Sequence, residues 1–67
     1  MKEVFLTNHK ETIFMGRCEG NPRTEIIYPY LENKGYEVRY IRLWEDEDGK
    51  AWVDFGDWSW FFFVVEK

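Results

Sequence analysis

Aromatic side chains are the feature of this sequence that most restricts its fold. Four Trp, four Tyr and six Phe make up 21% of only 67 residues, and seven of these rings lie between Trp52 and Phe63. A chain of this length forms one small domain with a limited core. Each buried ring removes roughly 150 to 250 Å² of surface from water, so a few rings fill such a core. We therefore expect a single domain, residues 1–67, that leaves some rings outside its core.

The segment from Glu3 to Gly16 has the residue pattern of a β-hairpin. A loop over Asn8–Glu11 sets four cross-strand pairs, which are Thr7 with Thr12, Leu6 with Ile13, Phe5 with Phe14, and Val4 with Met15. In this register one face carries the aliphatic side chains and Met15, and the opposite face carries both phenylalanines. Both faces of the hairpin therefore have apolar content.

A helix is predicted after this hairpin. Asn21 is a favoured N-cap residue, and Pro22 suits the first helical position. Four apolar residues then follow at helical spacing, namely Ile26, Ile27, Tyr30 and Leu31. Gly35 supplies the stop, so the helix has about 13 residues, and Pro29 kinks it because proline cannot donate to the Glu25 carbonyl. The alternative is a strand from Thr24 to Tyr28 followed by a short helical turn, Pro29 to Lys34.

The last half of the chain predicts three antiparallel strands, Tyr36–Glu45, Lys50–Phe55 and Trp58–Glu66. Two turn signals separate them, Asp48-Gly49 and the two-residue Gly56-Asp57 turn. The resulting register sets Glu45 against Lys50, Trp44 against Ala51, Phe55 against Trp58 and Val53 against Trp60. The predicted fold is α+β, an antiparallel sheet in ββαβββ order with one helix packed on one face. A small all-β barrel is the alternative.

This register divides the last three strands into two faces. The core face carries Val38, Tyr40, Trp44, Ala51, Val53, Phe55, Trp58, Trp60, Phe62 and Val64, with Arg42 as its one charged member. One helix covers one face of a sheet, so rings on the second face stay exposed. An exposed apolar patch usually marks an interaction site. The sequence therefore predicts a partner-binding patch made of Trp52, Phe61, Phe63, Leu43 and Ile41. In the barrel alternative, these side chains form a second core.

Four consecutive carboxylates, Glu45, Asp46, Glu47 and Asp48, lie in the first of these turns. They lack the alternating ligand order and the distal Glu of a calcium-binding EF-hand loop, so we predict no metal site. The simplest interpretation is a solvated turn in which Asp48-Gly49 serves the backbone. Alternatively, the loop mimics nucleic-acid charge and steers a basic groove of another protein, in which case affinity falls steeply with salt.

Several function classes are disfavoured by composition. The net charge of −4 argues against nonspecific binding to nucleic acid or anionic lipid. One cysteine, Cys18, and one histidine, His9, cannot supply a disulfide framework or a closed zinc site. The longest apolar run, Trp60 to Val65, is far shorter than the ~20 residues that span a bilayer. We expect a cytoplasmic protein without a cofactor.

Residues able to carry catalysis are few. Ser59 has no Gly-x-Ser-x-Gly elbow around it, and Cys18 and His9 fall at opposite ends of the second predicted strand. Asp54 and Asp57 lack a cleft that would perturb their pKa values. Stacking of single-stranded nucleic acid or of sugars on the aromatic face is a lesser alternative, because carboxylates outnumber cations on that face. We therefore expect neither an enzyme nor a direct nucleic-acid binder.

The size, acidity and lack of catalytic groups are similar to those of small phage counter-defence and host-takeover proteins, such as anti-CRISPR proteins. This resemblance is one of class and covers no motif. It implies a stoichiometric binding or inhibitory protein that acts on another protein in the host cytoplasm. The alternative is a structural homodimer, joined through the aromatic face or through Trp58–Glu66 as an edge strand.

Overall fold

In the part of the chain that the structure describes, an open five-stranded antiparallel sheet packs against one helix. The computed structural model describes residues 1–36, 41–57 and 59–67, so expectations that fall on residues 37–40 and 58 lie outside it. The strands are β1 (Lys2–Thr7), β2 (Thr12–Cys18), β3 (Arg42–Glu45), β4 (Ala51–Asp54) and β5 (Phe61–Glu66). The α+β class and the ββαβββ order are confirmed. The sheet is not closed, so the barrel alternative is wrong.

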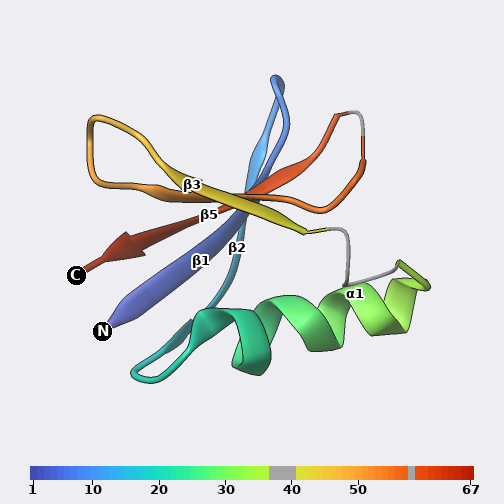
Figure 1. Ribbon diagram of the computed structural model, residues 1–67, viewed down its shortest axis with the longest axis horizontal. Coiled ribbons are helices and arrows are strands. Elements are labelled where there is room, and N and C mark those ends of the chain that lie inside the picture. The colour runs from blue at the N-terminus through green and yellow to red at the C-terminus, as the bar shows by residue number, and fades with distance from the viewer. Residues whose placement is uncertain (37–40, 58) are drawn as a thin grey trace.

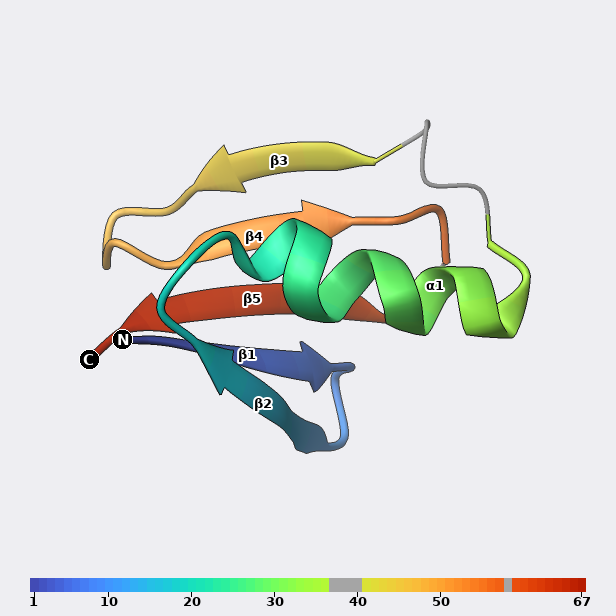
Figure 2. The same ribbon diagram turned by 90° about the horizontal axis from the view of Figure 1, so that it is seen from below.

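The strand order across the sheet is β2-β1-β5-β4-β3, which Figure 2 shows from the helix side. β5 pairs with β1 on one side and with β4 on the other. The expectation of an edge strand at Trp58–Glu66 is therefore wrong, because β5 lies at the centre and β2 and β3 form the edges. The sequence pattern of β5 alone contains no sign of its pairing with β1, which comes almost sixty residues earlier.

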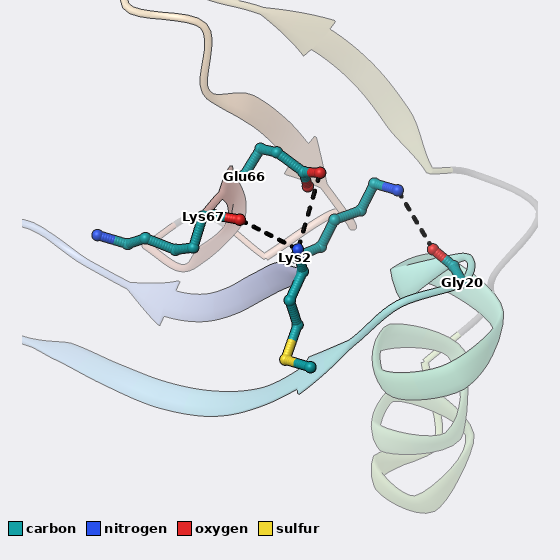
Figure 3. A network of polar contacts seen from close by, with 5 residues as sticks. Lys2, Gly20, Glu66 and Lys67 are labelled. Carbon is teal, nitrogen blue, oxygen red and sulfur yellow. Dashed lines mark hydrogen bonds and ion pairs between the residues drawn. The ribbon is translucent and has the colours of Figure 1, made fainter.

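Polar contacts at one end of the β1–β5 pair continue its register (Figure 3). The Lys67 backbone N–H donates to the Met1 carbonyl at 2.8 Å, and the Met1 ammonium donates to the Lys67 carbonyl at 3.1 Å. The Met1 ammonium also lies 3.9 Å from the Glu66 carboxylate. Lys2 Nζ donates to the Gly20 carbonyl at 3.4 Å and so ties β1 to the segment before the helix.

The predicted hairpin register holds along most of β1 and β2. Thr7 pairs with Thr12, Leu6 with Ile13 and Phe5 with Phe14, as expected. Val4, however, pairs with Gly16, because the register shifts between Val4 and Phe5. The predicted Val4–Met15 pair is therefore wrong. Met15 is the extra residue of a β-bulge, which leaves one residue of the bulged strand without a partner.

The predicted helix forms as one run of 12 residues, and the strand alternative for Thr24–Tyr28 is wrong. A π-helical turn η1 (Arg23–Ile27) precedes the α-helix α1 (Tyr28–Lys34). The wide turn ends with a bond from the Tyr28 N–H to the Arg23 carbonyl, directly before Pro29. A proline disrupts the regular α ladder, so the helix adopts the wider spacing at this point.

Both helix ends have the expected signals. The Asn21 side-chain oxygen accepts a hydrogen bond from the Arg23 backbone N–H at 3.0 Å. At the other end, Gly35 has φ 84° and ψ 15°, the left-handed conformation of a helix C-cap. The helix therefore ends at Gly35 as predicted, and it begins at Arg23, one residue after the predicted first position at Pro22.

The helix packs along one face of the sheet, as Figure 1 shows. Ile27 and Leu31 are fully buried, and Ile26 and Tyr30 pack against the same core, so the predicted apolar stripe is confirmed. The sheet contributes the remaining buried members of this core, which are Val4, Leu6, Val53, Phe55, Phe62 and Val64. We call this side of the sheet the helix-side face and the other side the aromatic face.

The register between β3 and β4 differs from the prediction by one residue. Trp44 pairs with Trp52 rather than Ala51, and Leu43 pairs with Val53. The loop is one residue shorter than expected, because the Asp46 N–H bonds to the Lys50 carbonyl at 3.0 Å. Gly49 at φ 81° is the left-handed residue that a three-residue hairpin loop requires. A shift of one residue moves every β3 side chain to the opposite face.

The connection from β4 to β5 is longer than the predicted Gly56-Asp57 turn. Val53 pairs with Phe62 rather than Trp60, a shift of two residues that leaves every side chain on its predicted face. Asp57 holds this connection: one of its oxygens accepts the Ser59 N–H at 3.0 Å, and the other accepts the Tyr36 hydroxyl at 2.8 Å.

Candidate interaction face

One ring from each of the five strands lies in a single line across the aromatic face. The β-sheet registers pair these residues directly, in the order Phe14, Phe5, Phe63, Trp52 and Trp44. We call these five residues the aromatic row. Directly paired residues point to the same face of a sheet, and the helix packs on the other face. The row therefore runs the whole width of the sheet, on the side opposite the helix.

Neighbouring rings of the aromatic row contact one another. Phe5 lies 5.0 Å from Phe63 between ring centroids, with planes 17° apart. Trp52 lies 5.1 Å from Phe63 and 6.3 Å from Trp44, and the two indoles are nearly parallel at 11°. Phe14 completes the row at 5.5 Å from Phe5. Two of the four contacts, Phe5–Phe63 and Trp52–Trp44, are therefore stacked, and the other two are tilted.

The two ends of the aromatic row are its most exposed members. Phe14 is 52% exposed on β2, and Trp44 is 45% exposed on β3, whereas the three inner rings are partly buried. Phe61 adds a sixth ring, which meets Trp44 edge-on at 6.4 Å. Large aromatic side chains at such exposure are typical of interaction surfaces.

Asp46 connects the acidic loop to the aromatic row. Its Oδ2 accepts the Trp52 indole N–H at 2.7 Å, and its Oδ1 accepts the backbone N–H groups of Asp48 and Lys50, each at 3.0 Å. The Trp52 bond is the main cause that lowers the pKa of the Asp46 carboxyl. Asp46 therefore stays ionised, fixes the indole and holds its charge at the first position after β3.

The remaining carboxylates of the loop have different positions. Glu47 and Asp48 are exposed at the tip of the β3–β4 hairpin. Glu45 is exposed as well, but it pairs with Ala51 and follows Trp44, so it lies on the helix-side face. Of the four predicted loop residues, two are thus free to meet a partner beside Trp52. The Asp46–Trp52 bond thus joins the two sites expected from the sequence, the aromatic patch and the acidic loop.

The membership of the predicted patch needs two corrections. Trp52, Phe61 and Phe63 lie on the aromatic face as expected. Leu43 does not, because it pairs with Val53 on the helix-side face. Ile41 is partly buried and packs against the core, which lies on the helix side of the sheet. Both errors follow from the one-residue register error in β3.

Three rings of the face were absent from the predicted patch. The predicted four-residue loop puts Trp44 on the core face. A three-residue loop with Gly49 in the left-handed conformation gives the observed register, so Gly49 is the signal that could have corrected this prediction. Phe5 and Phe14 were correctly expected on the second face of the hairpin. Nothing in the local sequence places that hairpin beside β5. The contact of Phe5 with Phe63 was therefore not predictable from the sequence pattern.

Charges border the aromatic row without one sign prevailing. Lys50 Nζ lies 5.1 Å from the centroid of the Phe63 ring. Arg17 Nε lies 3.3 Å from a carboxylate oxygen of Glu3, with which it pairs across β1 and β2. Near the other end of the row, Arg42 pairs with Asp54. Among the residues that the structure describes, cations and carboxylates therefore alternate along this face.

A shallow recess of about 370 Å³ adjoins the row at Trp52 and Phe61. Its other lining residues come from the end of β1, the β1–β2 loop and the β4–β5 connection, and they are Thr7, Asn8, His9 and Ser59. The recess gives the face a concave part, into which a side chain of a bound molecule can insert.

The candidate nucleophile and base lie far apart in the fold. His9 is exposed in the loop before β2, whereas Cys18 is buried at the opposite end of that strand. Burial and the neighbouring Glu25 carboxylate raise the pKa of the Cys18 thiol, which keeps it protonated and weakly nucleophilic. Among the described residues, no three His, Cys, Asp or Glu side chains gather where they could hold a metal ion. No helix in the described ranges is long and apolar enough to cross a membrane.

Comparisons with family models, curated proteins and solved structures give no match to this chain.

Proposed function

We propose that this protein is a non-enzymatic, stoichiometric binding protein that docks another protein on its aromatic face. The observation that carries this proposal is the aromatic row, which crosses all five strands opposite the helix and is most exposed at Phe14 and Trp44. Aromatic side chains provide much of the binding energy at protein interfaces. Cross-strand contacts use only part of the surface of Phe14 and Trp44, and exposed aromatic patches usually mark interaction sites.

The stacking geometry favours a protein over a nucleic acid or a sugar. Bases and sugars bind aromatic side chains through the ring faces. In the aromatic row, the faces of Phe5 and Phe63 are turned toward each other at 17°, and those of Trp44 and Trp52 at 11°. Rings that stack on one another leave less free ring face for a base or a sugar, whereas the half-exposed end rings suit the side chains of a protein surface.

The partner we propose has an apolar surface next to basic residues. Glu47 and Asp48 are exposed beside the end of the row that Trp52 and Trp44 form. These two carboxylates would steer a basic region of the partner, so salt slows association while the apolar contacts persist. A partner of this kind matches the counter-defence class in which an inhibitor occupies a basic groove, and it would place the protein in the host cytoplasm.

Two matched pairs of neighbouring residues test the proposal. Phe14 and Trp44 point to the aromatic face, and their neighbours Ile13 and Leu43 point to the helix-side face at similar exposure. The protein and the two double variants, Phe14→Ala/Trp44→Ala and Ile13→Ala/Leu43→Ala, are immobilised and exposed to extract of the native cells. We expect the native chain and the Ile13→Ala/Leu43→Ala variant to capture the same protein. The Phe14→Ala/Trp44→Ala variant should capture at least about tenfold less of it.

The captured protein, once purified, should bind the native chain with unit stoichiometry by calorimetry. Equal capture by both variants, or no capture at all, would contradict the proposal. Self-association through the aromatic face is the other outcome: in that case Phe14→Ala alone, at the edge of the sheet opposite β3, abolishes a dimer of the native chain, and the face serves a structural homodimer.

A further inference from the structure

Strand β3 has an open edge. All four of its residues are exposed, and within residues 1–36, 41–57 and 59–67 it pairs with β4 alone. The other edge strand, β2, carries the bulge next to Gly16, and bulges at sheet edges hinder pairing with further strands. β3 has the sequence RLWE, without proline or lysine, and its register with β4 is regular. Its edge is therefore the one suited to accept another strand.

The hairpin register determines which backbone groups face outward. Asp46 and Lys50 form a hydrogen-bonded pair, with the Asp46 N–H 3.0 Å from the Lys50 carbonyl. Hydrogen-bonded and non-hydrogen-bonded pairs alternate along an antiparallel ladder. Arg42 and Trp44 therefore turn their backbone groups toward β4. Leu43 and Glu45 turn theirs outward, where they are available to a second chain.

We propose that this edge pairs with β3 of a second copy of the chain, antiparallel about a twofold axis at Trp44. In this register, Leu43 of each copy exchanges two backbone hydrogen bonds with Glu45 of the other. Trp44 meets its own counterpart. Arg42 of each copy lies opposite Asp46 of the other, so the interface repeats one attractive charge pair on both sides of the axis.

Other registers of the same two strands are less favourable. An axis at Glu45 sets two Glu45 carboxylates directly opposite each other, and like charges in this position are destabilising. An axis at Leu43 leaves one hydrogen-bonded pair within β3 and removes the Arg42–Asp46 match. The axis at Trp44 combines both hydrogen-bonded pairs with charge complementarity.

The dimer joins two sheets edge to edge and leaves the aromatic faces free. A twofold axis perpendicular to the sheet keeps both aromatic rows on one side, so they meet end to end at Trp44. This inference concerns the edge of the sheet and does not depend on what binds its face. A dimer formed face to face would instead cover both rows.

Disulfide trapping tests the register directly. In a Cys18→Ala background, Trp44→Cys is expected to form a disulfide-linked dimer on mild oxidation, because facing Cα atoms of a non-hydrogen-bonded pair lie about 4.5 Å apart. Leu43→Cys and Glu45→Cys serve as matched controls. Neither should cross-link alone, since neither residue meets its own copy, but a mixture of the two should.

The mass in solution tests the interface without cysteines. Light scattering over a concentration series should show the native chain pass from 8.3 kDa to twice that mass. Arg42→Glu sets like charges opposite Asp46 on both sides of the axis and should raise the midpoint concentration about tenfold or more. Lys10→Glu changes the net charge equally in the β1–β2 loop and should leave the midpoint unchanged.

Two results would overturn this inference. One is a monomer at every concentration up to about 1 mM, the range in which weak specific dimers form. The other is a dimer that Phe14→Cys traps and Trp44→Cys does not, because that pattern places the interface on the aromatic face. Circular dichroism of each variant confirms that the sheet is retained.

Discussion

At the scale of single residues, Asp46 joins the acidic loop to the aromatic row through three side-chain hydrogen bonds. Its carboxylate accepts from the Trp52 indole and from two backbone N–H groups of its own loop. One residue thus shapes the β3–β4 hairpin and orients a ring of the aromatic row. The order of acidic residues in the sequence does not distinguish Asp46 from Asp48, because only the folded hairpin brings Trp52 within reach.

Replacement of Asp46 should destabilise the hairpin, whereas replacement of Asp48 should not. Asp46→Ala removes the acceptor of three hydrogen bonds and leaves the indole N–H in a partly buried position without its partner. We expect the melting temperature to fall by on the order of 5 °C. Asp48→Ala, two residues further along the same loop, is the matched control and should change the melting temperature little. Equal melting temperatures for both variants would contradict the structural role of Asp46.

The same carboxylate makes stability depend on pH. The pKa of Asp46 is lowered by the Trp52 bond, and that of Asp57 by bonds from the Ser59 N–H and the Tyr36 hydroxyl. A group whose pKa is lower in the folded than in the unfolded chain contributes stability that is complete above the unfolded pKa and is lost as the pH falls through the folded value. We expect urea midpoints to be constant near neutrality and to fall below about pH 4.

Nuclear magnetic resonance separates Asp46 from the other carboxylates in this transition. The Trp52 indole N–H signal should shift as Asp46 takes up its proton, below the ordinary carboxyl value of 3.8. The Trp60 indole, which has no such bond among the described contacts, is the internal control. A Trp52 signal that does not titrate would show that the bond to Asp46 is absent in solution.

At the scale of elements, the helix shows how a local conflict is resolved. Pro29 disfavours a regular α-helix, and the structure responds with the π-helical turn η1 before it, not with a strand. The reason is tertiary, because Ile27 and Leu31 on either side of the proline are both fully buried against the sheet. Burial of two large aliphatic side chains stabilises the helix by more than one irregular turn costs.

The C-cap of this helix provides a prediction about backbone conformation. Gly35 has φ 84°, and a Cβ at this position would meet no atom within 4 Å. Gly35→Ala should therefore lower the free energy of unfolding by about 1 kcal/mol through the left-handed backbone alone. Gly35→Asn should cost less, since asparagine tolerates this conformation better. Urea unfolding measures both, and an equal loss for the two variants would argue against the left-handed cap.

At the scale of the whole molecule, β1 and β5 form the centre of the sheet, although they come from opposite ends of the sequence. Their pairing brings Phe5 beside Phe63 and so unites the two halves of the aromatic row. The same pairing places Val4 and Val64 together in the core. The interaction face and the core thus depend on one long-range contact.

Two leucines test the division between the core and the exposed surface. Leu31 is fully buried beneath the helix, and Leu43 on β3 is 47% exposed. Leu31→Ala should lower the free energy of unfolding by about 2 to 5 kcal/mol, which is most of the stability of so small a domain. Leu43→Ala should change it by less than about 0.5 kcal/mol. Chemical denaturation compares them, and a large loss in Leu43→Ala would place that side chain in the core.

The sequence by itself determined the features whose causes are local. The α+β order, most of the first hairpin register, the capped helix and its buried stripe all follow from periodicity, capping residues and turn chemistry within a few positions. The faces of β4 and β5 were also predictable, because an error of two residues in their register leaves the two-residue period intact.

Only the tertiary structure decided how these elements combine into a surface. The pairing of β1 with β5 joins segments far apart in the chain, and no local pattern contains that information. The position of Trp44 rested on a single residue of loop length, and a one-residue change exchanges the two faces of a strand. The aromatic row depends on both the β1–β5 pairing and the β3–β4 register, which form together with the core in one sheet.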